Sequence, residues 1–293
     1  MIYRIQHQTL YNSVDPVSVG YNEAWLTPRN TPTQTCASHA LEISPEPSIL
    51  VTRTDYFQNN VTQFAFNQGY QTLKVTALNE VEIREAARPT EGGPPWEEVV
   101  AAVRAHLNAP DFEAYEFTFT SPRCWISQEF LAYGAPSFSA GRPILDAISD
   151  LIGRVYDEFE YDPTATTVST PVEQLFRLRR GVCQDFSHLV ISVLRSHGIP
   201  ARYISGYMRT SPPPGKPRLV GADASHAWVS VYCGPLGWID IDPTNNQFPS
   251  TDHITIAWGR DYLDVTPLRG VYIGGSSLKM RVSVDVRKSG FVG

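Results

Sequence analysis

Short runs of apolar residues that alternate or mix with polar residues fill the first 88 residues of the chain. The runs are rich in β-branched and aromatic residues, proline, asparagine and glycine separate them, and they cover residues 1–11, 41–43, 62–66, 73–77 and 81–83. Alternation places successive side chains on opposite faces of a strand, so the pattern predicts several short strands. Short strands joined by turn residues are typical of an antiparallel β-sandwich, which we expect as an N-terminal β-rich domain of residues 1–88.

The spacing of apolar residues changes after residue 89. Residues 89–95 are rich in proline and glycine and are typical of a linker. Helical spacing follows at residues 96–107, 143–159 and 171–178. We expect residues 89–150 to supply the linker and a helical segment of a core. Residues 151–293 should form the catalytic part of that core together with C-terminal strands.

The most regular helical pattern begins at Cys183. Apolar residues recur at helical spacing from Phe186 to Leu194, a glycine turn at Gly181 precedes them, and Gly198 with Pro200 follows. A cysteine on an apolar helix face is usually a buried core residue. At the start of a helix, however, the positive end of the helix dipole favours the thiolate, which is the nucleophilic form of cysteine.

Two alternating runs downstream, residues 226–232 and 238–242, predict a β-hairpin closed by the turn at residues 233–237. One face of this hairpin is apolar. The other face carries a histidine and two aspartates.

The hairpin register distinguishes between the two aspartates. If Tyr232 pairs with Trp238, His226 lies diagonally next to Asp242, at about 7–8 Å between backbones. Asp240 lies two residues further along and is too distant. The register therefore predicts Asp242 as the hydrogen-bond partner of His226.

Cysteine, histidine and aspartate in this order predict covalent cysteine catalysis at residues Cys183, His226 and Asp242. The thiol would attack a carbonyl carbon, and His226 would take the thiol proton and later protonate the leaving group. Asp242 would orient the imidazole, and the backbone N–H of Cys183 would donate to the oxyanion. Tyr161, Tyr207 and Trp228 are the residues we expect to contact substrate.

Composition narrows the class of protein. A net charge of -6, with no long run of lysine and arginine, argues against nucleic acid as the main partner. No apolar run approaches the roughly 18 residues of a membrane helix, and the first residues are too polar for a signal peptide, so we expect no membrane association and a cytoplasmic location.

Cysteine usage supports the same picture. The four cysteines, at positions 36, 124, 183 and 233, form no CxxC pair and no disulfide framework. We therefore expect a reducing compartment, no metal and no other cofactor.

Three motifs resemble the transglutaminase-like superfamily, and specifically its bacterial branch of candidate cysteine proteases. Residues 181–188 and 194–203 resemble the cysteine box of this family, residues 226–229 its histidine box, and residues 237–238 with 242–245 its aspartate box. Residues 7–11, 16–17, 26–29 and 55–57 resemble the β-rich region that precedes the core in the same branch. Gln58 departs from the glycine common at its position there.

The resemblance implies a papain-like α+β core, in which the cysteine helix packs on an antiparallel sheet, and a Cys183–His226–Asp242 triad. It implies acyl transfer from an amide of a peptide or protein to water or to an amine. Animal members of the family need calcium, but no acidic loop of this sequence supports a calcium site.

The sequence is compatible with several functions. The order of the three residues favours an amide-cleaving hydrolase, and an amine-acceptor transglutaminase would use the same residues. An arylamine acetyltransferase, a non-catalytic binding module on the same fold and a metal site built from Cys183 and His226 fit the pattern less well. Residues 209–218 predict an irregular loop that borders a substrate cleft.

Overall fold

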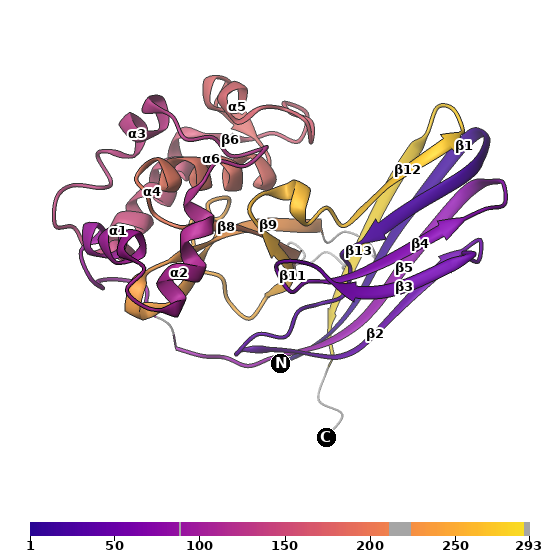
Figure 1. Cartoon of the computed structure of the whole chain (residues 1–293), viewed down its shortest axis with the longest axis horizontal. Coiled ribbons are helices and arrows are strands. Elements are labelled where there is room, and N and C mark those ends of the chain that lie inside the picture. Colours follow the sequence, from indigo (N-terminus) through magenta and orange to yellow (C-terminus); the bar gives the residue numbers. More distant parts are fainter. Residues whose placement is uncertain (88, 211–223, 290–293) are drawn as a thin grey trace, which may run out of the picture.

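The computed structural model describes residues 1–87, 89–210 and 224–289. A helical part with a small sheet lies beside an elongated antiparallel sheet (Figure 1). We expected an irregular loop at residues 209–218, and residues 211–218 of it lie outside the described residues.

The elongated sheet has seven antiparallel strands among the described residues. Its N-terminal strands are β1 (Ile2–Ala24), β2 (Gln34–Ser44), β3 (Ile49–Thr54), β4 (Asn60–Phe66) and β5 (Tyr70–Ile83). Their order is β2-β5-β1-β4-β3. The expected runs at residues 73–77 and 81–83 are parts of the single strand β5.

The long strand β1 divides this sheet into two halves. Residues 2–12 of β1 pair mainly with β5, whereas residues 20–24 pair with β4. Consequently β4 and β5 follow each other in the chain but are not paired. Their inner side chains instead share a second, smaller hydrophobic cluster, which contains Phe64, Phe66, Leu73 and Val75. The expected antiparallel β-rich region is confirmed, and its strands belong to one sheet.

The last two strands, β12 (Leu268–Gly274) and β13 (Lys279–Lys288), also pair with β1. We expected C-terminal strands within the catalytic core of residues 151–293, and their pairing places them in the N-terminal sheet instead. The physical reason is that β1 has a free edge along both halves, which β12 and β13 cover. The domain boundaries themselves stay a prediction.

The helical part contains α1 (Trp96–Ala105), α2 (Ala109–Tyr115), α3 (Gln128–Gly134), α4 (Ile144–Glu158), α5 (Val172–Leu178) and α6 (Cys183–Ser196). Its sheet contains β8 (Ala201–Met208), β9 (Ala224–Tyr232), β10 (Trp238–Ile241) and β11 (His253–Gly259) in the order β10-β9-β8-β11. Short elements complete the chain: β6 (Glu160–Tyr161), β7 (Arg180–Gly181), η1 (Glu116–Thr118), η2 (Gly234–Leu236) and η3 (Tyr262–Asp264).

Helix α6 packs on strands β8 and β9 (Figure 1). Its side chains are buried from Asp185 to Arg195. The expected α+β core, with the cysteine helix on an antiparallel sheet, is confirmed.

The elongated sheet and the helical part share one hydrophobic core. The larger cluster of buried residues joins Tyr3 and Ile5 of β1 and Val284 of β13 to residues of the helical part such as Leu189 and Val229. Because this cluster includes residues of both parts, the two parts stabilise each other.

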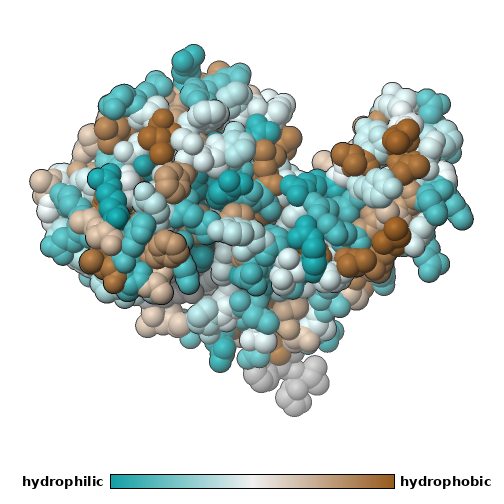
Figure 2. Space-filling view, viewed as in Figure 1, coloured by the Kyte–Doolittle hydropathy of each residue, from teal (hydrophilic) through white to brown (hydrophobic). Residues whose placement is uncertain are grey.

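Exposed apolar side chains lie on the outer half of the elongated sheet (Figure 2). Tyr21, Ile49 and Val271 are all more than half exposed. Tyr21 pairs with both Ala65 and Val271, and Ile49 pairs with Ala65, so these side chains form one row across four strands. Among the described residues, no helix is both long enough and apolar enough to cross a membrane.

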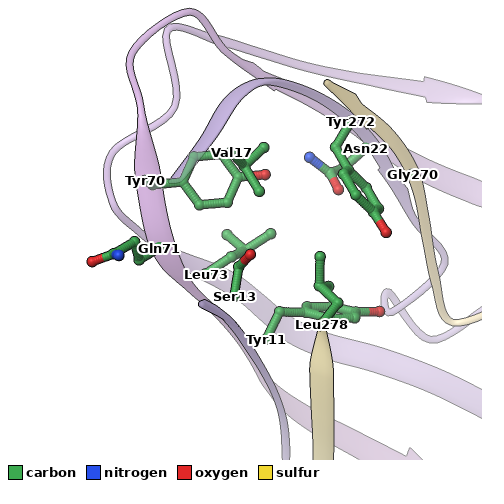
Figure 3. A pocket seen from close by; sticks show the side chains of 10 residues that line it. All are labelled: Tyr11, Ser13, Val17, Asn22, Tyr70, Gln71, Leu73, Gly270, Tyr272 and Leu278. Carbon is green, nitrogen blue, oxygen red and sulfur yellow. The ribbon is translucent and has the colours of Figure 1, made fainter. Parts of the chain in front are cut away.

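A cavity of about 90 Å³ lies between strands of this sheet (Figure 3). Tyr11, Tyr70 and Tyr272 contribute aromatic rings to its wall. The wall includes no cysteine, histidine or carboxylate. This cavity therefore offers no cysteine nucleophile and no histidine or carboxylate base.

Candidate active site

Helix α6 begins at Cys183 because the residues before it form a tight, hydrogen-bonded start. The backbone N–H of Val182 donates to Oδ2 of Asp185 at 2.9 Å, and Oγ1 of Thr166 donates to the same oxygen at 2.6 Å. A Cβ atom at Gly181 would lie 2.7 Å from that oxygen, so the approach requires glycine. The result is a helix whose first residue carries the thiol, near the positive end of the helix dipole.

The predicted hairpin register is confirmed. Trp238 pairs with Tyr232, and Asp240 pairs with Ser230. Nε2 of His226 donates to Oδ2 of Asp242 at 2.8 Å. Asp240 instead accepts a hydrogen bond from Nε1 of Trp228 at 3.2 Å. The choice of Asp242 over Asp240 as the partner of His226 is therefore correct.

Asp242 is fully buried and accepts hydrogen bonds on both oxygens. Oδ1 accepts the backbone N–H groups of Thr244 and Asn245 at 3.0 and 3.3 Å. Oδ2 accepts Nδ2 of Asn245 at 2.7 Å, besides His226. Burial raises the pKa of this carboxyl, but the hydrogen bonds from His226 and His253 outweigh burial and hold the pKa well below its usual range. Asp242 is thus a carboxylate of fixed orientation.

His226 is held in the charged form by its neighbours. Burial lowers the pKa of His226, but hydrogen bonds with Asp242 and with the Cys183 thiol outweigh burial and raise it to about 10. Because Nε2 is engaged by Asp242, the ring nitrogen left for Cys183 is Nδ1. Asp242 and Cys183 thus both act on the charge of His226, from opposite sides of its ring.

The remaining cysteines have different surroundings. Cys124 and Cys233 are buried, and burial raises the pKa of each thiol to about 12. Cys36 is half-buried on β2, and burial raises the pKa of its thiol as well. Cys183 is also half-buried, and among the four cysteines it is the one that raises the pKa of a histidine, His226.

The three residues expected to contact substrate differ in accessibility. Tyr161 is 57% exposed. Partial burial raises the pKa of its hydroxyl, and the nearby charge of Cys183 raises this pKa further. Trp228 is fully buried beside His226, and Tyr207 is 2% exposed with its hydroxyl against Nδ1 of His7. Because both side chains are almost inaccessible to solvent, direct contact of Trp228 or Tyr207 with substrate is disfavoured.

Sequence reasoning missed two partners of Asp242. His253, at the start of β11, places Nε2 3.1 Å from Oδ2 of Asp242, and Asn245 belongs to the aspartate box without an assigned role. The alternating run His253-Ile254-Thr255-Ile256 is a signal that could have revealed this strand. His226, Asp242 and His253 bring possible metal-ligating atoms within 4.8 Å of one another, although hydrogen bonds between them already engage these atoms.

Comparison with known proteins finds sequence relatives over both regions of the chain. Residues 135–243 match the transglutaminase-like superfamily, and residues 3–82 match the bacterial transglutaminase-like N-terminal region. An uncharacterized protein of Mycobacterium tuberculosis is 40% identical over 296 residues, covering 97% of this chain and 92% of that protein. A protein-glutamine gamma-glutamyltransferase of Pseudomonas aeruginosa is 33% identical over 107 residues, which cover 34% of this chain and 16% of that enzyme.

A solved structure shares the fold over the whole chain. It is a candidate cysteine protease from Cytophaga hutchinsonii, with a TM-score of 0.75 and 20% identity, covering 100% of this chain and 92% of that one. With both regions matched in sequence and a full-length relative at 40% identity, the chain belongs to the transglutaminase-like superfamily, with the bacterial N-terminal region of that family before its core.

Proposed function

We propose that this protein is a cysteine-dependent acyltransferase that acts on amide bonds, with water as its principal acceptor. The observation that carries the proposal is that Cys183, at the start of α6, is near enough to His226 to raise its pKa, while His226 donates to the buried carboxylate of Asp242. This arrangement supplies a nucleophile, a base and an orienting anion in the order that acyl transfer needs.

In the first step the Cys183 thiolate attacks the carbonyl carbon of the amide. The C–S bond forms, the carbonyl oxygen becomes an oxyanion, and the backbone N–H of Cys183 at the start of α6 is free of an intrahelical partner and can donate to it. Protonated His226 then gives its proton to the leaving nitrogen as the C–N bond breaks. The product of this step is a thioester on Cys183 and a free amine.

In the second step a water molecule attacks the thioester. His226, now neutral, takes a proton from the water, and the C–S bond breaks to release a carboxylic acid and the thiolate. Asp242 stays ionised throughout, fixes the tautomer of His226 and stabilises its charged form. No cofactor enters these steps.

The substrate we propose is a peptide or protein amide, which would approach Cys183 from the side of Tyr161. Tyr161 is the exposed side chain near the thiol, and it is paired in register with Gly181 through the short strands β6 and β7. The loop after Tyr161 reaches the start of α6, since Thr166 donates to Asp185. We propose a cytoplasmic location, because all four cysteines are free.

Transfer to an amine is the second candidate. It is favoured by the likeness of 107 residues of this chain to a protein-glutamine gamma-glutamyltransferase. An amine would attack the same thioester in place of water, and the same three residues would serve both reactions.

The test of the proposed function is to trap the acyl-enzyme and to identify its acceptor. Libraries of peptides and glutamine amides are incubated with the protein, with and without an added primary amine, and the mass of the Cys183 peptide is followed. We expect a thioester adduct and a free acid product with or without amine, and neither with the Cys183→Ala variant. Products that form only with added amine favour the transglutaminase, and activity that survives Cys183→Ala contradicts the proposal.

A further inference from the structure

A second histidine contacts the carboxylate that orients His226. Nε2 of His253 lies 3.1 Å from Oδ2 of Asp242, and the His253 side chain is 3% exposed. Because a carboxylate can only accept, the proton must be on Nε2 of His253. Among residues 1–87, 89–210 and 224–289, Nδ1 of His253 has no hydrogen-bond partner, so a proton there would lack an acceptor. The geometry fits a neutral histidine that donates from Nε2.

The ring of His253 is held by Trp228. The two rings meet edge to face, with centroids 5.3 Å apart and planes at 86°. Trp228 is itself fixed, because it is fully buried and its Nε1 donates to Asp240. A Cβ atom at Gly206 of β8 would lie 2.4 Å from the Trp228 ring. The absence of a side chain at Gly206 thus leaves room for the Trp228 ring, which in turn packs against His253.

The strand that carries His253 is braced by the N-terminal region. β11 is one of the two edge strands of the core sheet. The side-chain amide of Gln34 donates to the carbonyl of Thr255 at 2.7 Å and accepts the N–H of Thr255 at 2.9 Å. The amide of Asn59 makes the same pair of hydrogen bonds to Trp258, at 2.8 and 3.0 Å.

These two amides take the place of a neighbouring strand. Gln34 is 3% exposed and Asn59 is fully buried. Each satisfies one N–H and one C=O group that an edge strand would otherwise leave unpaired. They are also contacts at which residues of the N-terminal region fix the position of β11.

We propose that His253 is a positioning residue for the Asp242–His226 pair, and that Gln34 and Asn59 position His253 by holding β11. This inference rests on the proposed cysteine chemistry. It assigns the N-terminal region a part in the site, since that region anchors the strand from which His253 reaches Asp242.

The charged and titratable groups around Asp242 decide how the proposal is tested. His226 of β9 and His253 of β11 donate to it directly, and Cys183 of α6 lies beyond His226. Asp240 of β10 is turned to Trp228, and Asn245 is a neutral donor.

Two effects of removing His253 have opposite signs. If the hydrogen bond from His253 only weakened Asp242 as an acceptor, loss of His253 would strengthen the Asp242–His226 hydrogen bond and raise the pKa of His226. If His253 positions the carboxylate, its loss weakens the Asp242–His226 hydrogen bond and lowers the pKa of His226.

The experiment measures the rate of Cys183 alkylation by iodoacetamide from pH 4 to pH 11, resolved by mass spectrometry of the Cys183 peptide. In the wild-type protein we expect a plateau between two limbs: an acid limb, where the thiolate–imidazolium pair forms as the pH rises, and an alkaline limb, where His226 loses its proton and the rate changes to that of a free thiolate. His253→Met keeps a side chain of similar length without a donor. We expect its plateau to narrow, with each limb moved inward by on the order of one pH unit.

Two further variants separate positioning from folding. His253→Gln places an amide N–H near the position of Nε2, and we expect limbs within about 0.3 pH unit of wild type. Gln34→Met removes both hydrogen bonds to Thr255, and we expect a smaller inward shift. A folding defect alone would lower the fraction of protein in which Cys183 reacts, without changing the pH values at which the alkylation rate rises or falls.

The outcomes that overturn the proposal are distinct. A folded His253→Met variant with an unchanged or widened plateau contradicts positioning, as does a His253→Gln variant that behaves like His253→Met. If His253→Met does not fold, an unchanged profile of Gln34→Met contradicts the proposal. A wild-type protein without any plateau, in which Cys183 reacts like Cys36, contradicts the proposed function itself.

Discussion

At the scale of residues, two carboxylates on one hairpin have different partners. Asp242 accepts hydrogen bonds from the side chains of His226, His253 and Asn245. Asp240 accepts one from the indole N–H of Trp228. The alternation of residue types predicts that both aspartates lie on the same face of the hairpin. The strand register then identifies Asp242 as the one next to His226. The sequence therefore sufficed for the Asp242–His226 pair, because adjacent antiparallel strands fix diagonal neighbours.

Asp242→Asn tests this distinction. The amide keeps the size of the side chain but removes the charge that stabilises the imidazolium, so we expect hydrolysis to fall by about 100-fold or more. Asp240→Asn is the matched control, and we expect it to change hydrolysis by less than about twofold. Steady-state rates on the substrate found by library screening measure both, and similar losses in the two variants would contradict the assignment.

The pH dependence of stability tests the charge of His226. Its pKa in the folded protein, about 10, lies above the usual value of 6.5. The stabilisation is therefore complete below about pH 6.5 and is lost as the pH rises through 10. We expect the difference in unfolding free energy between wild type and His226→Gln to shrink between pH 6 and pH 10.5 in urea titrations. A difference that stays constant with pH would show that His226 is neutral in the folded state.

At the scale of elements, local patterns predicted α1, α4, α5, α6 and the β9–β10 hairpin, but not β11 or its histidine. The predicted elements carry their signal in their own periodicity. His253 gains its role only because β11 lies beside β8, and because Gly206 and Trp228 shape the space between the strands. Contacts of this kind depend on sheet order, which no local pattern contains.

Gly206→Ala tests the packing of these strands. The added Cβ would lie 2.3 Å from the carbonyl oxygen of Ile254 and 2.4 Å from the Trp228 ring, and both are held in place. We expect a loss of about 1–3 kcal/mol in unfolding free energy from overpacking.

Gly69→Ala is the matched control, because its Cβ would meet only the carbonyl oxygen of Val17 at 3.7 Å. We expect a change of less than about 0.5 kcal/mol. Urea unfolding measures both variants, and equal stabilities would mean that β8 and Trp228 adjust more freely than their burial implies.

At the scale of the whole molecule, the two ends of the chain form one sheet. β13 pairs with β1 from Tyr3 to Asn12, and β12 pairs with its second half. The sequence predicted β-rich residues at the start of the chain but assigned the last strands to the core. Pairing of residues 244 to 285 positions apart leaves no local signal, and for this reason the place of the last strands in the N-terminal sheet could not be read from the sequence.

The shared core predicts that residues 89–293 do not fold alone. Without residues 1–88, β12 and β13 lose their partner, β11 loses the amides of Gln34 and Asn59, and apolar residues such as Val284 become exposed. We expect this fragment to lack a cooperative thermal transition, whereas the full chain has one. Cooperative unfolding of the isolated fragment would contradict the account of one common core.

The central claim is that Cys183 is activated by His226, and the ratio of alkylation rates at Cys183 and Cys36 tests it most directly. Both thiols are half-buried, but only Cys183 is near enough to a histidine to raise the pKa of that histidine. At pH 7 and limiting iodoacetamide, we predict labelling of Cys183 at least about tenfold faster than that of Cys36, and a ratio near one in His226→Ala. Equal labelling of the two cysteines in the wild-type protein would contradict the claim.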